Sequence, residues 1–223
     1  MPAADLRDLD RDSPEFYFEF SREEMLEFLP EHPLRILDVG CGSGLFGKTV
    51  KERTGAEVWG IEMNENAAVQ ASARIDKVFI CPVEEALPQI PEHHFDCICF
   101  NDILEHLYNP YQLLLQAKKY LKPDGVISAS IPNIRYHDAL FDLVFRKQWT
   151  YMQGGTLDKT HIRFFTEKSI REMWRVLDFE ILKMKGVSHA RERWPRLLNM
   201  LTLGWLSDTL IAQFGCCVRP RRG

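Results

Sequence analysis

The sequence predicts an α/β fold: a mostly parallel sheet with helices on both of its faces. Short apolar segments alternate with amphipathic ones along the first two-thirds of the chain, as in repeated strand–helix–strand units with right-handed crossovers. The apolar segments are hydrophobic almost throughout, FDCICFN at 95–101 most clearly. Such continuous hydrophobicity is typical of parallel strands that are covered on both faces.

Seven segments are predicted to be strands, because each is a short apolar run bounded by turn or helix signals. The first, LRILDVG, closes at Gly40, and KPDG at 122–125 is expected to form a turn before the fifth. The predicted strands are 34–40, 56–63, 77–83, 95–101, 125–133, 180–187 and 215–220.

The intervening segments carry helical periodicity and residues that favour helix ends. Ser21 and Thr166 suit N-caps, Gly55 suits a helix end, and Pro110 predicts a kink or restart. The segment 150–165 is polar, contains glycine and is expected to be a loop. The predicted helices are 21–33, 44–55, 65–75, 102–121, 134–149, 166–179 and one or two within 193–214.

Composition narrows the functional class. The chain has 223 residues, 45% hydrophobic and 27% charged, which is ordinary for one soluble domain. Its net charge of −4 argues against a dedicated nucleic-acid binder. Six cysteines include no C-x-x-C pair, and Cys97 and Cys99 are expected on one face of a strand. With no apolar signal segment at the N-terminus, a cytoplasmic location is expected.

The C-terminal part differs in charge from the rest. Residues 186–223 hold six arginines against Glu192 and Asp208, and the run LLNMLTLGWLS is too short to span a bilayer. Its leucines form a stripe, which ordinarily covers a core. Together with Trp194, Trp205 and the nearby arginines, the stripe could instead rest weakly on a membrane surface.

A glycine-rich loop follows the first predicted strand. Gly42, Gly44 and Gly47 spell G-x-G-x-x-G, and Glu62 stands twenty residues beyond Gly42, as in a dinucleotide fingerprint. Asp38 would repel a pyrophosphate at this loop but would favour the ammonium and sulfonium of S-adenosylmethionine. A dehydrogenase therefore stays as the minor alternative to an enzyme that uses S-adenosylmethionine.

The motifs LDVGCGSG, GIEMN, FDCICFNDILEHL and LKPDGVISASIPN follow in order between about residues 35 and 133. As a set they resemble class I S-adenosylmethionine-dependent methyltransferases. The segment 148–172 resembles bacterial enzymes of the ubiquinone-type and polysaccharide-modifying group. The resemblance implies a Rossmann-like, seven-stranded sheet whose last strand is antiparallel, with a C-terminal helical cap.

The same resemblance divides one methyltransferase domain, 1–223, into three parts. They are an N-terminal helical segment (1–33), a cofactor-binding core (34–133), and an acceptor lid with a C-terminal cap (134–223). It also assigns cofactor-binding residues. In place of a common Gly-Asp pair the chain reads CPVEE, so adenine recognition is expected from the main chain near Val83. The full set is Asp38, Gly40, Gly42, Gly44, Glu62, Met63, Val83 and Asn101.

The stretch NDILEHLYNP concentrates polar chemistry at the end of the fourth predicted strand. On a helix, Asp102, Glu105 and His106 would share one face, and that face would lie at the carboxyl edge of the sheet, where ligands bind. His106 and His161 are the predicted catalytic residues, with His106 as general base. The alternative is a divalent metal on these four residues, which resemble the metal set of small-RNA 3′-end methyltransferases. We favour the base, because both carboxylates can also serve a helix start.

The expected function is methyl transfer from S-adenosylmethionine to oxygen on a sugar or glycan precursor. The alternatives are a metal-dependent 2′-O-methyltransferase acting on RNA ends and a non-catalytic S-adenosylmethionine-binding module. The expected partner is a small-molecule or glycan acceptor and no nucleic acid. Trp149 and Tyr151 could line its pocket, Arg163 could bind an anionic group on it, and 148–166 could close as a lid.

Overall fold

The computed structural model describes residues 21–190 and 192–221. The first twenty residues of the predicted segment 1–33 therefore lie outside the described residues. Among the described residues, none of the helices has the length and apolar character needed to cross a membrane.

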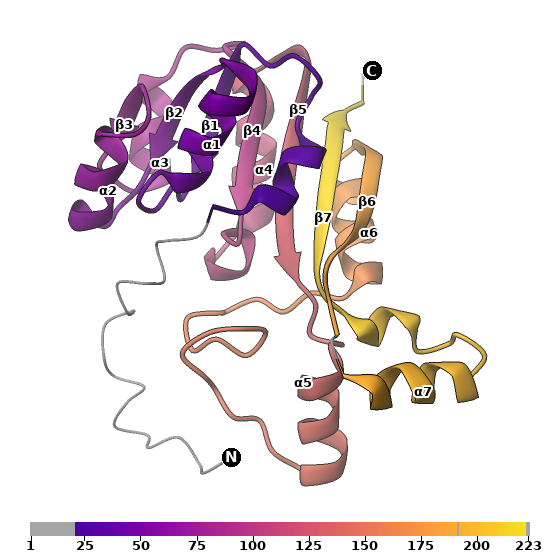
Figure 1. Ribbon diagram of the computed structural model, residues 1–223. Helices are drawn as coiled ribbons and strands as arrows, with labels where there is room; N and C mark the ends of the chain where they lie inside the picture. The colour runs from indigo at the N-terminus through magenta and orange to yellow at the C-terminus, as the bar shows by residue number, and fades with distance from the viewer. Residues whose placement is uncertain (1–20, 191, 222–223) are drawn as a thin grey trace.

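The core is a seven-stranded sheet in the order β3-β2-β1-β4-β5-β7-β6, as the ribbon in Figure 1 shows. Strands β1 to β5 run parallel, while β7 lies between β5 and β6 and is antiparallel to both. The prediction of a mostly parallel, Rossmann-like sheet with an antiparallel last strand is confirmed. The strands are β1 Arg35–Val39, β2 Glu57–Ile61, β3 Lys77–Phe79, β4 Phe95–Asn101, β5 Leu121–Pro132, β6 Phe179–His189 and β7 Ile211–Pro220.

Helices cover both faces of this sheet, so it has two separate hydrophobic layers. Strand β4 shows the alternation: Cys97 and Cys99 face one layer, whereas Ile98 and Phe100 face the other. The layer with the cysteines packs against the 3₁₀ helix Glu23–Phe28, α1 (Leu45–Thr54) and α2 (Glu65–Ser72). The opposite layer packs against α3 (Val83–Ala86), α4 (Pro110–Ala117) and α6 (Glu167–Val176).

Two helix ends follow their sequence signals. Gly55 ends α1 in the left-handed conformation, and the Thr166 hydroxyl accepts a hydrogen bond from Ser169 N to cap α6. The predicted cap at Ser21 is wrong: the first helix is a short 3₁₀ helix that begins after Arg22, whose φ is 47°. Its two buried residues, Met25 and Phe28, hold it on the sheet rather than any cap.

The helix predicted for 102–121, with a kink or restart at Pro110, is wrong in its first part. A 3₁₀ turn, Leu104–His106, is followed by extended backbone, and α4 starts only at Pro110, with the Asn109 side chain accepting from Gln112 N. The restart at Pro110 is confirmed, because proline fits a first helical position but not a helix interior. A second 3₁₀ turn, Lys118–Tyr120, ends the segment.

Smaller departures occur later in the chain. The predicted turn 122–125 lies inside β5, as an irregularity between two register pairs of β4 and β5. The helix predicted for 134–149 is α5 (His137–Phe141) followed by a π-helix, Asp142–Arg146. The end of 193–214 was predicted as helix, but 211–214 is the start of β7, because it pairs with strands on both sides. The remaining helices are α7 (Arg193–Leu201) and 3₁₀ turns at Leu87–Gln89 and Ser207–Leu210.

Candidate functional site

The glycine loop connects β1 to α1 at the carboxyl edge of the sheet. Gly40 and Gly44 both have left-handed backbones, with φ of 71° and 78°. A Cβ on Gly40 would lie 2.0 Å from Ile103 Cδ1, and one on Gly44 would lie 2.9 Å from the Cα of Ala71. The first contact shows that the loop adjoins the segment that carries Glu105 and His106. Glycine is thus required by both conformation and space.

Two carboxylates are buried beneath this loop. Asp38 is 2% exposed and Glu62 is 7% exposed. The Glu62 carboxylate accepts hydrogen bonds from Gly42 N at 2.9 Å and Asn64 N at 2.8 Å, and so fixes the loop to the end of β2. Burial, and then the charge of Glu62, raise the pKa of Asp38 to about 8.

This electrostatic environment is suited to a cationic ligand. Two buried acids beside a glycine loop repel each other, and a positive group between them and the solvent would relieve the repulsion. S-adenosylmethionine carries such groups, its ammonium and sulfonium, whereas a pyrophosphate would add to the repulsion. The residues present therefore fit S-adenosylmethionine. That Glu62 holds the ribose stays a prediction, since its oxygens here bind main-chain amides.

The other predicted cofactor residues follow neighbouring strands. Asn101 ends β4, and both polar atoms of its side chain are buried without a hydrogen-bond partner among the described residues. An unpaired buried amide at this edge suits a bound ligand. Val83 is buried at the start of α3, and Met63 is exposed just beyond β2. Their contacts with a cofactor remain predictions.

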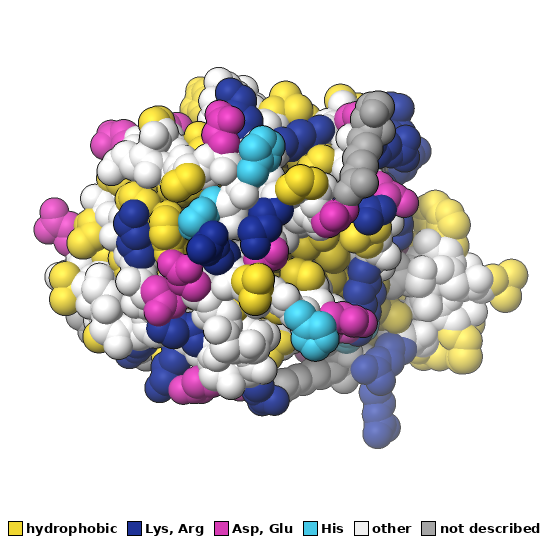
Figure 2. Space-filling model, turned by 90° about the horizontal axis from the view of Figure 1, so that it is seen from above, with side chains coloured by type: hydrophobic (Ala, Val, Ile, Leu, Met, Phe, Trp, Pro, Cys, Tyr) yellow, Lys and Arg dark blue, Asp and Glu magenta, His cyan; other side chains and the backbone are white. Residues whose placement is uncertain are grey.

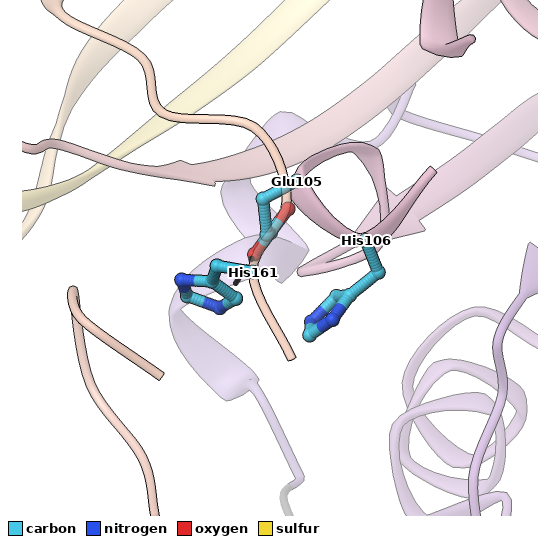
Figure 3. A group of neighbouring side chains, drawn as sticks. All are labelled: Glu105, His106 and His161. Atoms are coloured by element: carbon cyan, nitrogen blue, oxygen red, sulfur yellow. Dashed lines mark ion pairs between the residues drawn. The ribbon is translucent and has the colours of Figure 1, made fainter. Parts of the chain in front are cut away.

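Glu105, His106 and His161 meet at the same edge, as Figure 3 shows. One ligand atom from each lies within 4.8 Å of the other two. Glu105 is 1% exposed, and neither of its carboxylate oxygens has a hydrogen-bond partner in the described part of the chain. Its Oε1 lies 3.8 Å from His161 Nε2, within ion-pair range but beyond hydrogen-bonding distance.

Hydrogen bonds determine the tautomer of both imidazoles. His106 Nδ1 lies 3.2 Å from Thr160 O, and His161 Nδ1 lies 3.1 Å from Thr156 O. A carbonyl oxygen only accepts, so each Nδ1 carries the proton and each neutral ring has its lone pair on Nε2. Burial, and then the neighbouring His161, lower the pKa of His106. His106 is therefore suited to accept a proton or to bind a metal.

Burial also governs the protonation of Glu105. Burial, and then the charge of Asp102, raise its pKa well above the ordinary value, while Arg22 opposes the rise. A buried carboxyl group that has no hydrogen-bond partner among the described residues and lies close to one nitrogen of each imidazole fits a divalent cation held by one oxygen and two nitrogen ligands. The structure thus brings together three of the four residues of the predicted metal set.

The fourth, Asp102, has a different role, and the four-residue metal set is corrected to three. Asp102 has a left-handed backbone, with φ of 54°, so it does not share a helical face with Glu105 and His106. Its carboxylate pairs with Arg22 and accepts hydrogen bonds from the side chains of Ser130 at 2.8 Å and Gln213 at 2.7 Å. It joins the N-terminal segment to the ends of β5 and β7.

Sequence reasoning missed the residue that shapes the loop around the histidines. Asp158 is 2% exposed, and its carboxylate accepts from the amide and the hydroxyl of Thr160. The resulting turn places the carbonyls that hold His106 and His161. The signal was the Asp-x-Thr order within DKTH, which is typical of a side-chain-to-backbone turn.

A surface pocket of about 470 Å³ opens between the start of α4 and the start of α6, and neither histidine of the cluster lines it. Arg163 lies in it, donates to Tyr108 O at 2.6 Å and faces the Tyr108 ring. The prediction that Arg163 binds an anionic acceptor group stays a prediction. Of the two predicted pocket aromatics, Trp149 packs edge-on against Phe164, which lines this pocket, and both Trp149 and Tyr151 are partly exposed.

The chain resembles curated methyltransferases in sequence. It is 27% identical over 164 residues to the ubiquinone biosynthesis O-methyltransferase of Neisseria meningitidis, an alignment that covers 70% of this chain and 67% of that protein. Against the same enzyme of Vibrio cholerae, identity is 29% and the alignment covers 63% of the relative. The chain thus matches about two-thirds of the length of these relatives.

Solved structures show the same fold. A methyltransferase from Archaeoglobus fulgidus superposes with a TM-score of 0.65 at 18% identity and covers 92% of this chain and 96% of its own. The model of a methyltransferase domain family matches residues 13–184. With the glycine loop, the buried acids and the sheet order, this match shows that the chain belongs to the family of S-adenosylmethionine-dependent methyltransferase domains.

Proposed function

We propose that this methyltransferase transfers its methyl group to a hydroxyl oxygen of a small-molecule acceptor. The observation that carries the proposal is the convergence of one ring nitrogen of His106, one of His161 and the buried Glu105 carboxyl group, which has no hydrogen-bond partner among the described residues. An alcohol is a weak nucleophile and gains most from a base or a cation at its oxygen. A cluster of this kind is what transfer to oxygen needs.

Binding of the cofactor depends on the glycine loop and on the two buried carboxyl groups beneath it, those of Asp38 and Glu62. Bound S-adenosylmethionine supplies a methyl group on a sulfonium. Asp38 and Glu62 stabilise positive charge beside the loop, and Glu62 also holds Gly42 in place for the approach of the cofactor. Fixed alignment of the two reactants is worth up to about 7–11 kcal/mol of barrier in well-oriented reactions.

At the acceptor end, His106 is the residue that takes the proton. Its lowered pKa keeps the ring neutral near pH 7, and its Nδ1–H bond to Thr160 O fixes the direction of the Nε2 lone pair. As the acceptor oxygen attacks, its proton passes to that lone pair. The ring of His161, whose centroid lies 4.8 Å from that of His106, is held in the same way by Thr156 O.

A metal-assisted variant is supported by a separate observation: neither carboxylate oxygen of Glu105 has a hydrogen-bond partner among the described residues. Here Glu105, His106 and His161 would hold a divalent cation, and the cation would lower the pKa of the acceptor hydroxyl. The base and the metal variants share the same residues and the same reaction. Removal of metal ions with a chelator distinguishes the base variant from the metal variant.

The names of the relatives and the residues around the site limit the class of acceptor. The curated relatives are named for ubiquinone biosynthesis, which supports oxygen as the target and favours a precursor of that kind. The sugar or glycan precursor predicted from 148–172 has only the aromatic side chains in its favour. An RNA end is opposed by the net charge of −4.

The test is turnover with S-adenosylmethionine labelled in its methyl group. Ring-hydroxyl precursors of ubiquinone type, sugar and glycan precursors, and RNA 3′ ends would be offered in parallel. We expect label in an oxygen-linked methyl group of the first class, and roughly 10²–10⁴-fold slower labelling after His106→Asn. Label appearing only on nitrogen acceptors would overturn the proposal. NAD binding in place of S-adenosylmethionine would overturn the cofactor assignment as well.

A further inference from the structure

A lobe outside the catalytic cluster exposes many large apolar side chains. It consists of α5 with its π-helix, and of α7 with the turn that follows. At the tip, Leu203 is 97% exposed and Trp205 is 77% exposed, and Phe145 on the π-helix is 70% exposed. The further exposed members are Leu143, Val144, Trp194, Leu197, Leu198, Met200 and Leu201.

The backbone holds this lobe out from the sheet. Leu203 and Gly204 have φ of 53° and 87°, a left-handed turn that sends the chain back toward β7. The side chain of Asn133, fully buried just after β5, donates to Asp208 O and Ile211 O and so fixes the base of the lobe. Figure 2 shows hydrophobic side chains at the outer rim of the lobe, on the right of the molecule.

The two parts of the lobe belong together. The ring of Trp194 at the start of α7 lies 5.6 Å from the ring of Phe141 in α5, and 5.2 Å from that of His137. Phe141 in turn packs against Phe145 at 5.2 Å. An aromatic contact therefore joins the π-helix to α7, which lie side by side at the lower end of Figure 1.

The charge of the lobe is opposite to that of the chain. The lobe, residues 137–147 and 193–205, contains Arg146, Lys147, Arg193 and Arg196 against Asp138 and Asp142, a formal charge of +2, whereas the whole chain has a net charge of −4. Asp142 forms an ion pair with Arg146 within the π-helix. Apolar residues flanked by cations in an otherwise acidic protein match a surface of apolar chains beneath anionic headgroups.

We propose that this lobe docks on a phospholipid membrane that contains anionic lipids, with Leu203 and Trp205 inserted at the boundary of headgroups and acyl chains. A lipid surface fits better than a folded partner, because a projecting tip that is exposed on nearly all sides is enveloped by a fluid phase but not by a rigid surface. Tryptophan is also the residue that prefers this boundary.

The position of the lobe on the sheet determines which side of the enzyme would face the membrane. Asn133, which anchors the lobe, directly follows β5 at the carboxyl edge of the sheet, the edge that also carries Glu105, His106 and His161. Docking would bring the acceptor side of the enzyme close to the membrane. The proposal does not depend on the acceptor, since binding to vesicles is measured without turnover.

The experiment is flotation of the full chain with vesicles of phosphatidylcholine alone or of phosphatidylcholine with 30% phosphatidylglycerol, the mixture we choose as probe. We expect flotation with the anionic vesicles that weakens as salt is raised. Leu203→Glu/Trp205→Glu should weaken it at least about tenfold, because two inserting side chains become charged. Arg193→Gln/Arg196→Gln should remove most of the preference for anionic vesicles.

The matched control is Val176→Glu/Leu115→Glu, which places the same charges at exposed apolar positions on α6 and α4. This control should float like the unchanged protein. The control and the tip variant Leu203→Glu/Trp205→Glu should have the same melting temperature. The proposal would be overturned if the protein floated with neither kind of vesicle. It would also be overturned if the tip variant and the control variant floated equally. Light scattering provides a further check: a dimer that only the tip variant dissociates, without vesicle binding, would assign the surface to a second copy instead.

Discussion

His106 and His161 lie with their ring centroids 4.8 Å apart, and the planes of the two rings are inclined by 74°. The Nδ1 atom of each is held by a main-chain carbonyl of one short loop, Thr160 O for the first and Thr156 O for the second. One loop therefore sets the tautomer of both rings. In the proposed mechanism, catalysis therefore depends on that loop as much as on the histidines themselves.

The first prediction concerns the base. His106→Asn should lower turnover by roughly 10²–10⁴-fold, the usual contribution of a positioned general base. The affinity for S-adenosylmethionine should be nearly unchanged, because the proposed cofactor contacts are the glycine loop and Glu62 rather than His106. Steady-state kinetics and calorimetry measure the two effects. A variant with full turnover would mean that the ring only fills space.

The pH profile gives a second prediction with a fixed sign. Burial and His161 lower the pKa of His106, so the neutral ring persists further into acid than that of a free histidine. Turnover should rise with pH through this lowered pKa and level off above about pH 6.5, the ordinary value. A rise centred above the ordinary value of histidine would point to another group as the base.

Chelation gives the third prediction. If Glu105, His106 and His161 act without a metal, EDTA leaves activity intact and Glu105→Gln changes it only modestly. If they hold a divalent cation, EDTA abolishes activity, Mg²⁺ or Mn²⁺ restores it, and Glu105→Gln removes most of it. We expect the first outcome, because the tautomers already supply a base. Metal content measured on the purified protein decides between the two independently of activity.

The fourth prediction is that Glu105 makes the folding stability of the protein depend on pH. The folded state raises the pKa of Glu105 above its unfolded value, so the folded protein binds the proton more tightly. This contribution to stability is present in acid and is lost as pH rises above the unfolded pKa. Glu105→Gln should flatten that part of the pH–stability curve of the metal-free protein. Urea denaturation at several pH values measures it, with Glu52→Gln on the exposed face of α1 as control.

Most of the fold was predictable because its signals are local. Gly55 ends α1, Thr166 caps α6, and β4 reads as continuous apolar sequence with the predicted bounds 95–101. The antiparallel β7 was expected from the family resemblance, whereas the order of the strands was not predicted, since no local pattern records which strands become neighbours.

The errors arose where tertiary contacts override local pattern. Asp102 has helical spacing from Glu105 and His106, yet its bonds to Ser130 and Gln213 hold it in a left-handed conformation outside any helix. Residues 211–214 have no distinctive strand signal, and only pairing with β5 and β6 makes them a strand. The chain around His161 was predictable as a loop, but the role of Asp158 required the fold.

Two glycines that share a conformation offer a matched test of the loop. Gly44 and Gly55 have φ of 78° and 73°, at the start and end of α1, but only Gly44 has backbone of another helix within reach of an added Cβ. Gly55→Ala should cost about 1–2 kcal/mol of unfolding free energy from conformation alone. Gly44→Ala should cost a further 1–3 kcal/mol or so from the clash with Ala71. Equal losses in urea denaturation would show that α2 yields to the added methyl.

The last prediction follows from the pKa of Asp38, which burial and Glu62 raise to about 8. At pH 7 the free protein therefore holds this carboxyl group largely protonated. A ligand that brings positive charge to the glycine loop favours the carboxylate, so binding of S-adenosylmethionine should release a proton and tighten as pH rises from about 6 to about 8. Calorimetry in buffers of different ionisation enthalpy counts that proton. Asp38→Asn should abolish the release and weaken binding by about 1–3 kcal/mol, the usual size of a charged interaction, while Glu52→Gln leaves both unchanged. Proton uptake on binding, or affinity independent of pH in this window, would mean that Asp38 stays protonated beneath the loop and that the cationic part of the cofactor lies elsewhere.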